Sequence, residues 1–88
     1  MKAFILYRPQ SEFARRAEEY VHDFQRTRGQ QLGLIDIDSV EGVAAVELYD
    51  VVDNPALLIT RENGELINQW LGVQSFPLMN ELAAQLAE

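Results

Sequence analysis

The chain contains no cysteine among its 88 residues. It can therefore form no disulfide, bind no metal through thiolates and perform no thiol–disulfide exchange, because each of these needs a cysteine sulfur. Its one histidine, His22, lies off the apolar stripe of its predicted helix, where we expect it to be solvated. The sequence therefore predicts neither a metal site nor a cofactor.

Long apolar runs are also missing. The stretch 56–59 is typical, and it is far shorter than the roughly 20 residues of a membrane-spanning helix. Residues 1–7 include one lysine and too short an apolar core for a signal peptide. With 48% hydrophobic residues, the chain has enough material for one packed core. We expect a cytoplasmic protein with a single domain over residues 1–88.

Basic residues are scarce after the first third of the chain, and the net charge is −7. This charge argues against binding to nucleic acids or to anionic membranes. Six of the seven basic residues precede position 30: Lys2, Arg8, Arg15, Arg16, Arg26 and Arg28. Positions 31–53 hold no basic residue and six acids: Asp36, Asp38, Glu41, Glu47, Asp50 and Asp53. These residues form either solvated helix faces or an interaction surface, and the chain is expected to be a monomer or a weak homodimer.

The first third of the chain predicts a strand and a helix. Residues 3–7 are a short apolar run, typical of a buried strand. One helical stripe follows, made of Phe13, Ala17, Tyr20, Val21 and Phe24. Ser11 is the expected N-cap of this helix and Gly29 its C-terminal stop.

A second strand and a second helix are predicted next. Residues 32–37 read as the strand, and Asp38-Ser39 offers a cap for a helix over residues 40–51. Gly42 is expected to weaken the first turn by roughly 1 kcal/mol relative to alanine. The expected inner face of this helix consists of Ala44, Ala45, Leu48 and Val52, with Tyr49 beside them.

The last third predicts a hairpin and a final helix. Pro55 opens an apolar strand over 56–60, and Asn63-Gly64 is a strong turn signal before a returning strand over 65–71. Gly72 ends the hairpin. Ser75 is the expected cap of the last helix, with Pro77 in its first turn. The inner face of that helix is expected to be Leu78, Leu82, Ala83 and Leu86.

Tyr49, Val51 and Pro55 stand at a spacing that resembles the one preceding the third strand of thioredoxins. The apolar strand, the Asn63-Gly64 turn, the closing Gly72 and the final helix continue the likeness. The whole order, β-α-β-α-β-β-α, resembles the thioredoxin-like fold in its minimal, glutaredoxin-sized form. The resemblance implies an α/β fold with a mixed four-stranded sheet of order 2-1-3-4 and helices on both faces. It also implies a cis bond between Asn54 and Pro55.

The chain departs from this family at its redox centre. Redox members carry a Cys-x-x-Cys pair between the first strand and the first helix. Aligning Pro9 with the proline that precedes the pair puts Ser11 and Ala14 at the two positions, and a shift of one turn would put Arg8 and Ser11 there instead. Both alignments leave the positions without a thiol, which excludes redox catalysis.

Two functions remain compatible with the resemblance. Thioredoxin-like proteins use the backbone before the cis-proline to pair with an extended peptide, and members without cysteines, such as the circadian-clock KaiB family, serve as interaction modules. We therefore predict a non-enzymatic domain that binds a protein or peptide. Its groove would consist of Arg8, Pro9, Gln10, Ser11, Asp53, Asn54 and Pro55. Trp70 is either a packing residue or a partly exposed interface anchor.

The alternative is a glutathione- or small-thiol-binding protein. Tyr7 ends the first strand, where a tyrosine in glutathione transferases stabilises a bound thiolate. The same family uses a Glu/Gln-Ser pair after the hairpin, and here Gln74-Ser75 offers one that is shifted in position. The helical second domain of the transferases is missing from this sequence.

Overall fold

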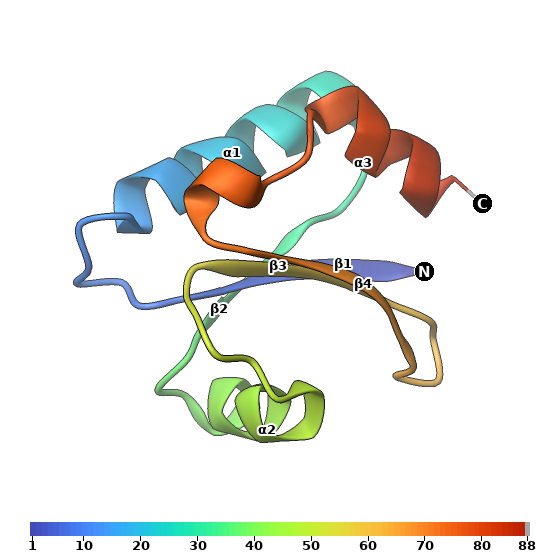
Figure 1. The fold of residues 1–88 in the computed structure, drawn as a ribbon. Coiled ribbons are helices and arrows are strands. Elements are labelled where there is room, and N and C mark those ends of the chain that lie inside the picture. Colours follow the sequence, from blue (N-terminus) through green and yellow to red (C-terminus); the bar gives the residue numbers. More distant parts are fainter. Residues whose placement is uncertain (88) are drawn as a thin grey trace.

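A four-stranded sheet lies between two helices on one face and one helix on the other (Figure 1). The computed structural model describes residues 1–87. Its elements are β1 (Lys2–Tyr7), α1 (Ala14–Arg28), β2 (Gly33–Asp36), α2 (Val40–Tyr49), β3 (Ala56–Thr60), β4 (Leu66–Leu71), the 3-10 helix η1 (Val73–Ser75) and α3 (Met79–Leu86). In residues 1–87, no helix is long and apolar enough to cross a membrane.

The strands lie in the order β2-β1-β3-β4, which confirms the predicted topology. β1 and β2 are parallel, whereas β3 is antiparallel to both β1 and β4. Tyr7 is paired with Asp36, and Leu6 is paired with Ala56. The last residues of β1 and β2 and the first residue of β3 therefore lie at one end of the sheet.

The central strands separate two hydrophobic clusters. Ile5, Leu57 and Ile59 point toward α1 and α3, where Phe24 and Leu82 are fully buried. Leu6, Ala56 and Leu58 point to the opposite face and pack beneath α2. All five residues of β3 are buried because helices cover both faces of the sheet at this strand.

Two predicted helix caps are wrong. The N-cap of α1 is Phe13 rather than Ser11, because a turn occupies residues 9–13 and the Ala14 N–H bonds to the Ser11 carbonyl oxygen. The N-cap of α3 is Leu78 rather than Ser75. A proline pushes the residue before it into an extended conformation, and Phe76 has ψ 138, so the helix cannot begin before Pro77.

The inner faces of the two later helices also differ from the prediction. Leu78 is exposed because it precedes α3, and Met79 packs against the core beside the buried Leu82. The Ser39 hydroxyl caps α2 by accepting from the Gly42 N–H at 3.0 Å, as predicted. However, α2 turns a different face to the sheet: Gly42, Ala45, Val46 and Tyr49 face inward, while Ala44, Leu48 and Val52 are exposed.

The predicted hairpin is present, but its turn is wider than two residues. The Gly64 N–H bonds to the Arg61 carbonyl oxygen, and Gly64 has φ 93. The Asn63 side chain accepts a hydrogen bond from the Glu65 N–H at 3.0 Å. Glycine supplies the single positive φ that this turn requires, because a side chain there would be strained.

Candidate functional site

The candidate site is the end of the sheet where β1 and β2 finish and β3 begins. Four connections meet there: residues 8–13 after β1, 37–39 after β2, 53–55 before β3, and Gly72 with η1 after β4. Figure 1 shows them on the side of the molecule opposite the N-terminus and the β3–β4 hairpin. The fold thus places the two halves of the predicted groove, 8–11 and 53–55, at the same end of the sheet.

The β1–α1 connection is a compact turn. The Ser11 N–H donates to the Arg8 carbonyl oxygen at 3.0 Å. The Arg8 side chain is half exposed, and its Nε lies 3.6 Å from Asp38 Oδ2. Such an exposed pair contributes at most about 1 kcal/mol, so the guanidinium can exchange partners easily. Asp38 was missed as a site residue, although parallel strands place the residues that follow β1 and β2 side by side.

Ser11 and Ala14 occupy the positions that redox members give to cysteines under the first alignment. The Ser11 Oγ is shielded from solvent and has no hydrogen-bond partner within residues 1–87. Ala14 is buried as the first residue of α1. A nucleophilic serine needs a base within hydrogen-bonding distance. Within residues 1–87, no such base is hydrogen-bonded to the Ser11 hydroxyl, so the structure shows no activated serine at this turn.

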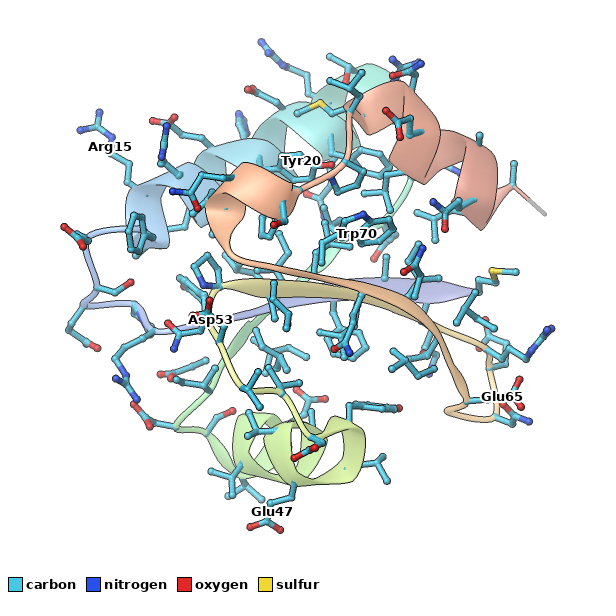
Figure 2. All side chains as sticks on the ribbon, viewed as in Figure 1. Arg15, Tyr20, Glu47, Asp53, Glu65 and Trp70 are labelled. Atoms are coloured by element: carbon cyan, nitrogen blue, oxygen red, sulfur yellow. The ribbon has the colours of Figure 1, made fainter. Side chains whose placement is uncertain are left out.

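The segment before β3 presents an unpaired backbone. The Asn54–Pro55 peptide bond is cis. The Asn54 N–H donates to the carboxylate Oδ1 of the preceding Asp53 at 2.8 Å. Within residues 1–87, the backbone groups of 52–54 form no backbone–backbone hydrogen bond. Val52 and Asp53 are exposed, and Figure 2 shows Asp53 beside the start of β3.

Gly72 closes the site on the β4 side. Its N–H donates to the Pro55 carbonyl oxygen at 2.9 Å, and its φ is 86. A Cβ at this position would lie 3.8 Å from Asp53 Oδ2 and 3.6 Å from Gln74 Oε1. Two side-chain acceptors therefore lie close to the glycine, beside the segment that carries Asn54.

The alternative of glutathione binding depends on Tyr7, and the surroundings of this residue disfavour a bound thiolate. Its hydroxyl donates to Glu18 Oε2 at 3.4 Å. Burial raises the pKa of Tyr7, and the Glu18 carboxylate raises it further. The phenol therefore stays protonated, but the neighbouring carboxylate would repel a thiolate anion.

The remaining predicted residues lie elsewhere. Trp70 is half-buried and packs against the cluster beneath α1 and α3 (Figure 2), so its role as an interface anchor stays a prediction. Within residues 1–87, no group of three or more metal-ligating side chains occurs. A cavity of about 590 Å³ lies between α2 and the sheet, and one of about 340 Å³ lies between α1 and η1. The predicted groove residues line neither of these two cavities.

Comparison with known proteins identifies the fold. Thioredoxin 1 from Thermosipho africanus TCF52B superposes with a TM-score of 0.67 at 11% identity, covering 99% of this chain and 91% of that one. The oxidised thioredoxin from Plasmodium falciparum gives a TM-score of 0.66 at 16% identity, with coverage of 99% and 83%. No family model matches the sequence, and no curated protein matches it either. The chain is thus a cysteine-free domain with the thioredoxin-like fold, and these residues cannot perform a thioredoxin's dithiol reaction.

Proposed function

We propose that the chain is a non-redox binding domain for an extended peptide segment of a partner protein. The peptide lies at the end of the sheet, between the turn Arg8–Ser11 and the segment Asp53–Pro55. The observation that carries this proposal is the backbone of residues 52–54, which forms no backbone–backbone hydrogen bond within residues 1–87 and leads into the central strand β3. An added strand satisfies such groups by main-chain hydrogen bonds.

The Asp53 carboxylate competes with the peptide. It holds the Asn54 N–H at 2.8 Å, in the place where a peptide carbonyl oxygen would accept. Binding must therefore displace this side chain, and each such exchange costs part of the roughly 1 kcal/mol that one hydrogen bond contributes. Asp53 has no basic partner within residues 1–87, whereas Asp38 is paired with Arg8, so we expect the preferred peptides to be neutral or basic beside Asp53.

Peptide selection followed by mapping tests the proposal. Random 12-residue peptides displayed on phage are selected against the folded chain, and the enriched peptides are titrated against labelled protein. The expected result is saturable amide shifts concentrated in residues 8–11 and 53–56. No enrichment over a blank surface, or shifts confined to other parts of the molecule, would contradict the proposed site.

A pair of variants at one position tests the competition. Asp53→Ala removes both the charge and the acceptor, so binding tightens by about two- to tenfold if the Asn54 N–H pairs with the peptide. Asp53→Asn removes the charge but keeps an oxygen acceptor, so its effect should be smaller. Equal affinities in the two variants would mean that the amide is not used.

Glutathione serves as the competing ligand. It is favoured only by the two acceptors around Gly72 and by the hydroxyl of Tyr7. Titration with glutathione should leave the amides of Tyr7, Ser11 and Asn54 unshifted. Saturable shifts at these three residues would replace the peptide with a small thiol as the ligand.

A further inference from the structure

Helix α2 carries apolar side chains on its outer face as well as on its inner face. Val40 is 91% exposed and Leu48 is 71% exposed, and Val43 and Ala44 are exposed between them. These four residues follow the spacing i, i+3, i+4 and i+8, which places them on one side of the helix. A helix that covers a sheet with one face normally presents polar residues on the other, so this stripe is a candidate contact surface.

The stripe continues into the larger cavity. Ala44 and Leu48 also line the space of about 590 Å³ between α2 and the sheet, together with Phe4, Ile35 and Tyr49. The outer stripe and this cavity are hereafter called the α2 surface. It combines a ridge with an adjoining hollow, which is the shape that accepts a large apolar anchor residue.

Helix α2 and its C-cap Asp50 carry only negative charges, whereas Lys2 and Arg61 also line the cavity. Glu47 projects away from the sheet (Figure 2), and its spacing of four and seven residues places it on the same side of α2 as Val43 and Val40. Glu41, Glu47 and Asp50 form no ion pair within residues 1–87. The part of an occupant that lies along α2 meets these unpaired carboxylates, so positive charge on that part favours binding.

A second copy of the chain fits this requirement poorly. Symmetric docking through α2 would bring the three carboxylates of each copy together, and like charges at short range oppose association. The basic residues of α1 offer no better match. Arg15 and Arg26 are already paired with Glu19 and Asp23. Arg16 and Arg28 form no ion pair within residues 1–87, but α1 exposes no large apolar side chain that could pack on the stripe.

We propose that the α2 surface binds a basic amphipathic helix of a partner protein. Its apolar residues would pack on Val40, Val43 and Leu48, with one anchor entering the cavity beside Tyr49. Its lysine or arginine side chains would meet Glu41 and Glu47. This mode is helix-in-groove recognition, and it is independent of the extended peptide at the end of the sheet.

Two peptides of matched shape test the proposal. Both are 18-residue helical probes, in the range of about 12–20 residues that gives a stable helix, with leucines at the same heptad positions. One carries lysine at its flanking positions and the other carries glutamate. The lysine peptide should shift the amides of Val40, Val43 and Leu48 in a saturable way, and its affinity should fall as salt is added. No binding, or equal binding of the glutamate peptide, would overturn the proposal.

A pair of surface leucines provides the control. Leu48→Ser should weaken binding about tenfold, because it removes a central apolar contact. Leu78→Ser changes a leucine of similar exposure, 66%, that lies beside α3 on the other face of the sheet. It should leave the affinity unchanged, and an equal loss in both variants would overturn the assignment. If sedimentation shows a wild-type dimer that Leu48→Ser abolishes, a second copy is the occupant and the proposal is wrong.

Discussion

Gly42 is the residue at which α2 comes closest to the backbone that follows β2. A Cβ at this position would overlap the Asp36 carbonyl oxygen and lie 2.8 Å from Ile37 Cα. Both neighbours are backbone atoms, which cannot rotate away. We expect Gly42→Ala to destabilise the protein by about 3 kcal/mol or more in urea unfolding, despite the roughly 1 kcal/mol that alanine adds in helix propensity.

Gly29 is the matched control for this substitution. It ends α1 with φ 66, and no atom would lie within 4 Å of an added Cβ. Gly29→Ala should therefore cost only about 1 kcal/mol, through the strained backbone conformation alone. A loss at Gly42 no larger than the loss at Gly29 would refute the close contact.

Gly42 shows that a residue predicted from sequence to destabilise the protein can instead be required for its packing. Helix propensity counts this glycine as a weakness, whereas the packing of α2 requires it. Local structure also explains why the predicted caps Ser11 and Ser75 are wrong. A turn separates Ser11 from α1, and Pro77 prevents α3 from starting at Ser75. The predicted Asp38-Ser39 cap is present through Ser39, because the turn at residues 37–38 ends there and no proline follows it.

At the scale of the elements, Tyr20 joins α1 to the segment that leads into α3. Its hydroxyl donates to the Pro77 carbonyl oxygen at 2.8 Å, and its ring meets the ring of Phe76 edge-on at 5.2 Å. Burial, and to a lesser degree the Glu81 carboxylate, raises the pKa of Tyr20 from 10.0 to about 12. Tyr20→Phe should cost about 1 kcal/mol at neutral pH, because it leaves the carbonyl without its donor.

The raised pKa also predicts a dependence on pH. The folded state holds the phenol proton more tightly than the unfolded state does, so this stabilisation is complete below pH 10.0 and is lost as the pH rises toward about 12. Because the phenol is only partly buried, solvent screens part of this effect, and across that interval the wild type should lose about 1 kcal/mol more than Tyr20→Phe. Urea unfolding at neutral and alkaline pH measures the difference. Parallel pH profiles of the two proteins would show that Tyr20 does not titrate with unfolding.

Sequence patterns predicted which segments form helices and strands far better than which side of each helix packs on the sheet. α1 has one clear apolar stripe, and the buried Ala17, Val21 and Phe24 lie on it as predicted. α2 has apolar residues on every side, in addition to Glu41 and Glu47, so their spacing alone does not show which side packs on the sheet. The sheet settles the choice, because only the side that carries Gly42 allows the close approach.

At the scale of the whole molecule, the strand order was predicted from the resemblance to the thioredoxin-like fold, which two local signals supported. A helix between two strands makes them parallel, and a tight turn makes two strands antiparallel, so few topologies remained. The resemblance also predicted a groove between residues 8–11 and 53–55, and the fold places both segments at one end of the sheet. The resemblance did not predict that Asp38 pairs with Arg8 or that Asp53 occupies the Asn54 amide, because these contacts depend on side-chain geometry.

The net charge of −7 leads to a final prediction about the whole molecule. Salt screens repulsion among the acids, which raises stability, and it also screens ion pairs, which lowers it. In residues 1–87 there are five ion pairs, and each includes at least one well-exposed side chain. Such pairs contribute at most about 1 kcal/mol each and often much less.

Repulsion should outweigh the ion pairs, because of the six acids in positions 31–53 only Asp38 has a basic partner within residues 1–87. We therefore expect the urea midpoint to rise when sodium chloride is raised from about 10 to about 200 mM, by an amount equivalent to about 0.5–1 kcal/mol. Glu47→Gln should reduce this increase, since it removes one of the unpaired carboxylates. A midpoint that falls with salt would mean that the surface ion pairs stabilise the fold more than the clustered acids destabilise it.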